Sequence, residues 1–279
     1  MADVAIVADS CADLTPEVSK AFGITVVPLT LTIGDESMPD GTLTQAEFFE
    51  RMNASAQLPT TSQPSVGAFV EAYRLALESA SQVVSIHISS KLSGTISSAR
   101  SAAEEFGGRV HVVDTANLSW GEGLQVIEAA KAAAAGLSPE AIIERVHRAR
   151  ERVKLFVVLD SLDNLVKGGR ISKFAGSVGG MLNVKMSITC RDGEIVPVRP
   201  MRGTKAALDY TIRWVEEHMG DARRGVFSIM HAMSEERVLV IKEAILERFE
   251  AIELYMVETG TVISTHTGTG WGVAFLPEE

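Results

Sequence analysis

The first half of the chain alternates short apolar runs with segments whose apolar residues recur every three or four positions. The apolar runs are rich in β-branched residues, which is typical of buried strands. The expected strands are Val4–Val7, Ile24–Ile33, Val83–His87 and Val110–Val113. The expected helices are Pro16–Phe22, one that follows the capping box Thr44–Glu47, Val66–Leu77, Ile96–Phe106, Leu124–Ala135 and Pro139–Arg152, with loops at Gly34–Gly41 and Gln57–Ser65. This order predicts a parallel sheet with helices on its faces.

The second half has a different pattern, because a strong two-residue hairpin signal, Asp192-Gly193, separates two of its strands. Its expected strands are Leu155–Leu159, Val184–Cys190, Glu194–Val198, Val226–Met230, Glu253–Val257 and Gly272–Leu276. Its expected helices are Leu162–Val166, Ser172–Leu182, Thr204–Met219 and Glu235–Phe249, with a tight turn at Lys167–Arg170. We therefore predict an α/β protein of two units, a parallel one at 1–152 and a mixed one at 153–279.

Composition places the chain among ordinary globular proteins. It has 279 residues, of which 46% are hydrophobic and 22% charged. We expect the N-terminus to be a first strand and not a signal peptide, because it lacks a basic region and carries Asp3 and Asp9. Cys11 and Cys190 are far apart and have no metal-ligand neighbours. This usage favours a reducing, cytoplasmic setting.

Charge is unevenly distributed along the chain. The formal net charge is −10, yet 13 of the 26 Lys and Arg residues and only 5 of the 36 Asp and Glu residues lie between Arg145 and Lys205. An acidic chain with a basic middle segment is poorly suited to general nucleic-acid binding, so we expect no nucleic-acid partner. The segment suits an acidic or phosphate-bearing partner instead.

Hydroxyl residues gather where the strand Val83–His87 ends. Six Ser and Thr residues and Gly94 fall between Ser89 and Ser98, just before a helical segment. A strand that passes through such a loop into a helix start brings backbone N–H groups and hydroxyl donors together, which suits an anion. Helix capping by Ser93 or Thr95 uses the same atoms, so both interpretations stand.

Several catalytic signatures are absent from the sequence. It contains no G-x-S-x-G, no Gly-Lys pair of a P-loop, and neither H-E-x-x-H nor C-x-x-C. The six histidines show no metal-ligand spacing, so we expect no metal and no cofactor. We expect His87 and His231 to be core residues and His147 and His218 to be solvated. His266 lies in a Gly-rich stretch that we expect to be a loop, and it is the candidate functional histidine.

Six separated motifs together resemble the DegV family over the whole chain. They are Asp9-Ser10 with Asp13-Leu14, TSQPS at 61–65, SSKLSGT at 89–95, LVKGGRIS at 165–172, RGTKA at 202–206 and THTGTGWGVAF at 265–275. The understood members of this family are bacterial fatty-acid-binding proteins, the lipid-carrying subunits of a two-component fatty acid kinase. The resemblance implies two α/β domains with a fatty acid in a tunnel between them. It also implies a separate kinase subunit that phosphorylates the bound acid to an acyl phosphate.

The resemblance also implies residue roles. The carboxylate of a long-chain fatty acid would contact Thr61, Ser93 and His266, with Ser62 and Gly94 close by. Arg170, Lys173 and Arg202 would face the kinase subunit. The chain itself would be a carrier and not an enzyme, with transient membrane contact when the lipid is exchanged.

Two departures from the family pattern bear on the tunnel. Met186 stands where relatives usually carry proline, and Ser264 and Trp271 replace smaller residues around His266. We expect Trp271 to narrow the head-group site or to cap the tunnel.

Two other functions use the same residues. One is a hydrolase with Ser93 as nucleophile, His266 as base and Asp9 or Asp114 as the orienting carboxylate. The other is a protein that binds a small phosphate ligand in the Ser/Gly loops.

Overall fold

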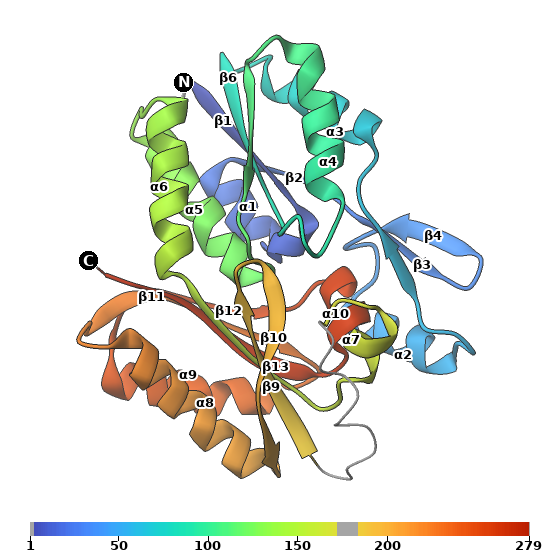
Figure 1. The fold of residues 1–279 in the computed structure, drawn as a ribbon, viewed down its shortest axis with the longest axis vertical. Helices are drawn as coiled ribbons and strands as arrows, with labels where there is room; N and C mark the ends of the chain where they lie inside the picture. Colours follow the sequence, from blue (N-terminus) through green and yellow to red (C-terminus); the bar gives the residue numbers. More distant parts are fainter. Residues whose placement is uncertain (1–2, 172–183, 279) are drawn as a thin grey trace.

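The computed structural model describes residues 3–171 and 184–278, in which two sheets lie one above the other (Figure 1). The first sheet has the parallel order β2-β1-β6-β7. Its strands are β1 (Val4–Asp9), β2 (Ile24–Val27), β6 (Gln82–His87) and β7 (Val110–Asp114). All four strands precede residue 152, and the expected parallel sheet is confirmed.

Helices cover both faces of this parallel sheet. They are α1 (Pro16–Phe22), α3 (Val66–Ala76), α4 (Thr95–Ala103), α5 (Trp120–Ala134) and α6 (Pro139–Arg152), with short 3₁₀ turns η1 (Ser10–Ala12) and η2 (Glu104–Phe106). Phe69 and Tyr73 of α3 pack on one face together with α4. Val126 of α5 and Val146 of α6 pack on the other. The helix α5 begins four residues earlier than the pattern predicted.

A small antiparallel arm interrupts the parallel unit. It consists of β3 (Thr30–Ile33), β4 (Glu36–Pro39) and β5 (Thr60–Ser62) in the order β4-β3-β5. The helix α2 (Gln45–Ala54) lies between β4 and β5 along the chain. The single strand that we expected over Ile24–Ile33 is wrong, because the chain leaves the first sheet at Pro28, which lacks the N–H that a ladder needs. The two expected loops over 34–41 and 57–65 are also wrong in part, since they contain β4 and β5.

The second sheet is mixed, as predicted, and has the order β10-β9-β8-β13-β11-β12. Its strands are β8 (Lys154–Leu159), β9 (Val184–Arg191), β10 (Glu194–Arg202), β11 (Arg224–Ala232), β12 (Glu250–Glu258) and β13 (Gly270–Pro277). Only the β11–β12 pair is parallel among these described strands. The expected hairpin at Asp192-Gly193 is confirmed, because β9 and β10 flank it.

The second sheet buries one face under two helices and the other against the first half of the chain. α8 (Thr204–Met219) and α9 (Glu235–Arg248) cover the outer face (Figure 1). Residues of the inner face, such as Ile188 and Met230, share a core with Trp120 and Leu124 of α5. Two short helices, α7 (Asp163–Lys167) and α10 (Thr261–Thr267), lie at the edge of this junction.

Two expectations about the second half need comment. The helix expected over Ser172–Leu182 lies outside the described residues. The Gly-rich stretch that we expected to be a loop contains α10, so His266 lies on a helix. The division into independent units at 1–152 and 153–279 stays a prediction, although each of the two large sheets takes its strands from one side of that boundary.

Candidate functional site

An open pocket lies between the two halves of the chain and encloses about 920 Å³ of space, part of it continuous with solvent. Three segments that are far apart in sequence meet there: β5, the loop before α4, and α10. The pocket is lined by five of the expected residues, namely Thr61, Ser93, Gly94, Arg170 and His266.

Hydrogen bonds fix the polar side chains of this pocket. Thr61 Oγ1 and His266 Nε2 lie 2.8 Å apart and join the arm to α10. Ser93 Oγ lies 2.8 Å from Thr95 Oγ1 and accepts the backbone N–H of Thr95 at 3.3 Å. Ser93 therefore interacts with the start of α4 and still lines the pocket, so capping and anion binding are compatible here.

His266 is a neutral imidazole at physiological pH. Burial, with the nearby Arg170 guanidinium as a second cause, lowers the pKa of His266 to about 4. Arg170 donates to the carbonyl of Gly168 at 2.6 Å and lines the same pocket. A Cβ at Gly168 would lie 2.6 Å from His266 Nδ1, so the turn can pass this ring only with glycine at that position.

Other expected site residues do not line the pocket. Ser62 is exposed on β5, opposite Thr30. Arg202 is exposed on β10, opposite Val184. Lys173 lies outside the described residues.

Sequence reasoning assigned no role to several polar residues of the pocket, among them Gln63 and Lys91. A Cβ at Gly94 would lie 2.7 Å from Gln63 Nε2, so Gly94 makes room for this side chain. Both residues fall inside motifs that had been singled out, TSQPS and SSKLSGT, and that placement was the available signal.

A narrow apolar cavity lies behind the polar pocket; its walls enclose about 510 Å³ of space not filled by atoms, part of it continuous with solvent, and about 30 Å³ of this admits the centre of a water molecule. Leu155, Val157 and Leu159 of β8 form part of its wall, and further wall residues come from β9, β11 and β13. Four residues line both spaces: Leu118, Ile195, Ile263 and Thr267. The polar pocket and the apolar cavity are therefore adjacent parts of one site.

Trp271 is among the residues that line the apolar cavity, and the expectation that it narrows the head-group site or caps the tunnel stays a prediction. Trp271 is buried in the core under α8 and α9, and its Nε1 donates to Thr211 Oγ1 at 3.3 Å. Side chains alternate along a strand, so Gly270 and Gly272 face away from the indole of Trp271, and all three residues of β13 line the cavity. Met186 is buried in the core shared by the two halves, paired with Leu159 of β8.

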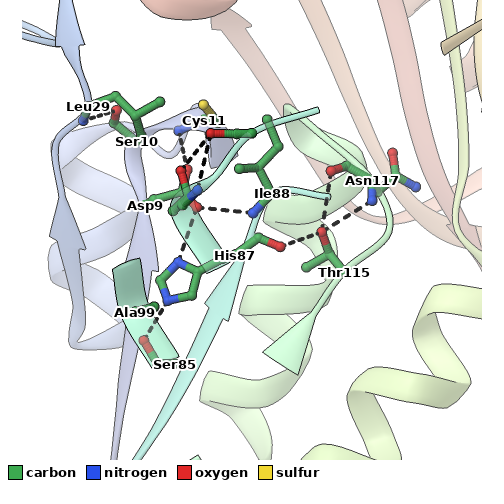
Figure 2. Close-up of polar contacts among 12 residues, drawn as sticks. Asp9, Ser10, Cys11, Leu29, Ser85, His87, Ile88, Ala99, Thr115 and Asn117 are labelled. Atoms are coloured by element: carbon green, nitrogen blue, oxygen red, sulfur yellow. Dashed lines mark hydrogen bonds and ion pairs between the residues drawn. The ribbon is translucent and has the colours of Figure 1, made fainter. Parts of the chain in front are cut away.

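A separate network of buried polar groups joins the carboxyl ends of β1 and β6 (Figure 2). The carboxylate of Asp9 accepts the backbone N–H groups of Cys11 at 2.9 Å and Ile88 at 3.0 Å, and it bonds His87 Nδ1 at 3.1 Å. His87 Nε2 lies 2.6 Å from Ser85 Oγ. His87 is thus a core residue, as expected, and Asp9 fixes the ends of β1 and β6.

These contacts disagree with the catalytic triad of a hydrolase. Asp9 orients His87 and not His266, while Asp114 accepts the N–H groups of Ser90 and Ala116. His266 bonds Thr61, and Ser93 bonds Thr95. With no hydrogen bond between Ser93 and His266, the described residues lack the nucleophile–base contact that such chemistry requires.

Among the described residues, two of the remaining histidines, a possible metal site and possible membrane-spanning helices contribute no further candidate site. His147 and His218 are both exposed, as expected, and the ring of His218 also stacks on Trp214 with ring centroids 3.7 Å apart. In residues 3–171 and 184–278, no three His, Cys, Asp or Glu side chains are grouped so as to hold a metal ion. None of the helices described has the length and apolar character needed to cross a membrane.

Fold and site define an α/β protein with a polar pocket adjacent to an apolar cavity between two sheets. A family model described as "Uncharacterised protein, DegV family" matches residues 3–278, and the chain belongs to the DegV family. It is 40% identical over 280 residues to a DegV domain-containing protein of Deinococcus radiodurans, covering 98% of each chain.

Solved structures with the same fold include proteins reported with fatty acids. One is a DegV family protein from Thermus thermophilus described by its fatty acid binding, with a TM-score of 0.93, 33% identity and coverage of 99% of this chain and 100% of that one. Another is a DegV family protein from Ruminococcus gnavus described with vaccenic acid, with a TM-score of 0.88, 27% identity and coverage of 99% and 100%.

Proposed function

We propose that this protein binds one long-chain fatty acid, with the carboxylate at Thr61, Ser93 and His266 and the tail in the apolar cavity. The observation that carries the proposal is the junction of the two spaces through four shared wall residues. An amphipathic ligand with one charged end matches a site that is polar at one end and apolar behind it. The Thermus and Ruminococcus relatives support the ligand class.

The energetics of such a ligand suit this arrangement. At about 0.8 kcal/mol per buried methylene, a 16-carbon tail contributes roughly 10 kcal/mol gross. The carboxylate needs several donors, because a buried charge without partners is costly. Hydroxyl groups and a neutral His266 can supply these donors without forming an ion pair, and Arg170 adds positive potential at the same pocket.

We further propose that the protein acts as a carrier in the cytoplasm and presents the carboxylate to a separate kinase subunit, which forms the acyl phosphate. Exposed side chains, among them Gln63 and Lys91, line the polar pocket, so a partner could reach the carboxylate there. Arg202 and Lys205 are exposed and make no ion pair within the described part of the chain. Their free charge suits a partner that carries ATP or an acidic face.

The test is to extract the purified protein and identify its lipid by mass spectrometry, and then to titrate oleate into delipidated protein in a calorimeter. We expect a co-purified fatty acid and a single saturable site. Lipid-free protein that also ignores oleate would refute the proposal. Binding of inorganic phosphate without binding of oleate would favour the small phosphate ligand.

A further inference from the structure

One motif of the sequence has no part in the function proposed so far, namely Asp9-Ser10 followed by Asp13. The carboxylate of Asp9 binds backbone N–H groups at the ends of β1 and β6. Asp13 lies elsewhere, at the junction of the two halves of the chain. It follows η1 with a left-handed backbone (φ +52°), and its side chain is buried.

The Asp13 side chain joins the first half of the chain to the start of α10. Its Oδ1 accepts the backbone N–H of Gly260 at 2.8 Å, and its Oδ2 accepts the hydroxyl of Ser119 at 2.5 Å. The contact with Gly260 is close: a Cβ on that glycine would lie 2.8 Å from Asp13 Oδ1. Only glycine lets the backbone approach this carboxylate so closely.

A second carboxylate from the first half of the chain, that of Asp40, binds the next two residues, Thr261 and Val262. Asp40 Oδ1 accepts the N–H of Thr261 at 3.1 Å, the hydroxyl of Thr261 at 2.6 Å and the N–H of Val262 at 3.2 Å. The first N–H groups of a helix have no partners within the helix. Here Asp13 and Asp40 accept the three consecutive backbone N–H groups from Gly260 to Val262.

The other end of α10 carries the head-group histidine. His266 lies in its last turn, 2.8 Å from Thr61 Oγ1. Asn164, near the start of α7, donates to the carbonyl of Thr265 at 3.1 Å. The helix is therefore attached to the first half of the chain at its first turn, while its last turn, which carries His266, contacts Thr61 and Asn164.

Backbone geometry at the attachment supports a functional role. Ser119, the hydroxyl partner of Asp13, has φ +49° and ψ −141°, a conformation that is unfavourable for a residue with a side chain. Such strain persists only where the surroundings fix it, and it concentrates at functional sites. Ser119 also lines the apolar cavity.

We propose that Asp13 and Asp40 are positioning residues of the head-group site, which hold His266 in register with Thr61 by fixing the first turn of α10. The proposal rests on the fatty-acid-binding function proposed above and extends it. Asp13 and Asp40 act through the helix and touch no ligand. Loss of either attachment leaves the pocket donors in place but frees the ring of His266.

The test is a double-mutant cycle with Asp13→Ala and His266→Ala, in which calorimetry measures the affinity of delipidated protein for oleate. We expect Asp13→Ala to weaken binding roughly tenfold in the wild-type background and less than about twofold when His266 is absent. Asp13→Asn, which keeps an acceptor for Gly260, should restore most of the affinity.

A matched control is Gln45→Ala. Gln45 also joins the two halves, since it donates to the carbonyls of His231 and Thr259 and accepts the N–H of Met233, but it bonds no residue of α10. We expect its loss to lower thermal stability without a comparable loss of affinity. In the ligand-free protein, the imidazole ¹⁵N resonances of His266 should shift in Asp13→Ala and stay in place in Gln45→Ala.

Equal weakening by Asp13→Ala with and without His266 would overturn the proposal, because Asp13 would then act through overall stability. If Asp13→Ala does not fold, the same cycle is run with Asp40→Asn. A wild-type protein that binds no oleate would refute the proposed function instead, and the His266 resonances would still decide whether Asp13 positions that ring.

Discussion

At the residue scale, the central feature is a histidine that stays neutral beside a guanidinium. Burial and Arg170 both disfavour the imidazolium form of His266, which lowers its pKa to about 4. A neutral ring can hydrogen-bond a carboxylate without pairing with it as an ion. That leaves the carboxylate oxygen more available to attack a phosphoryl group, as the proposed function requires.

The lowered pKa of His266 predicts a pH dependence of stability. The unfolded chain takes up a proton near the ordinary pKa of 6.5, and the folded protein takes it up only near 4. The unfolding free energy contributed by this group is therefore intact above pH 6.5 and falls by about 3 kcal/mol as the pH is lowered to 4. Urea unfolding of delipidated protein at pH 7, 5.5 and 4.5 measures this loss.

The matched controls for that measurement are His266→Gln and His147→Gln. We expect the first to remove most of the His266 contribution and the second, at an exposed position, to leave the pH dependence as it is. An identical slope for wild type and His266→Gln would show that other groups are responsible.

The hydroxyl donors give a second prediction at this scale. A hydrogen bond to a charged acceptor contributes about 1.5–3 kcal/mol, so Ser93→Ala and Thr61→Ala should each weaken oleate binding roughly ten- to a hundredfold. Thr60→Ala is the control, because Thr60 is exposed on the same strand and lies outside the pocket. Unchanged affinity in both site variants would mean that the carboxylate binds elsewhere.

At the element scale, long segments were predictable and short ones were not. The bounds of α6 and α8 and the β9–β10 hairpin follow from local capping, helical spacing and a turn dipeptide. The strand β5 has only three residues, Thr-Thr-Ser, and no apolar alternation. It forms because β3 offers it an edge, and no local signal reveals that pairing.

The helix α10 was missed for a related reason. Its seven residues are mostly β-branched or polar, a composition with weak helix propensity. Its first turn is fixed by Asp13 and Asp40, which lie more than 200 residues away in sequence. The motifs identified the site residues, but they could not show which ones α10 and the arm bring together.

The glycines of β13 give a prediction about ligand length. A Cβ on Gly272 would lie 3.0 Å from the Phe156 carbonyl oxygen and from Val157 Cγ2, and 3.3 Å from Met230 Cε. Because Val157 and Met230 line the cavity, we expect a side chain there to take up part of it. Gly272→Val should shift the bound fatty acids toward shorter chains and lower stability by about 1–3 kcal/mol. Mass spectrometry of the co-purified lipid measures the shift.

The matched variant is Val273→Leu, which adds bulk to the opposite face of the same strand, in the core under α8 and α9. It should lower stability without changing the chain length of the lipid. The same lipid profile in wild type and Gly272→Val would place the end of the tail away from β13.

At the scale of the whole molecule, the structure shows where basic residues of the middle segment of this acidic chain lie. Arg170 lines the head-group pocket, and Arg199 packs over the ring of Tyr210 at 4.8 Å. Both therefore have partners within the molecule. Arg202 and Lys205 are exposed at the junction of β10 and α8, and their charges remain available to another protein.

This distinction predicts that Arg202→Glu separates lipid binding from phosphorylation. Oleate affinity should stay near wild type, because Arg202 does not line the pocket, while acyl-phosphate formation with a cognate kinase subunit should fall steeply. Raising the salt concentration should partly reproduce the loss in the wild-type protein, since the Debye length shortens to about 3 Å at 1 M. Arg109→Glu, an equal charge reversal at an exposed site of the first half, should leave both activities unchanged. If Arg202→Glu instead abolished lipid binding and left kinase docking intact, Arg202 would belong to the binding site and not to the docking surface.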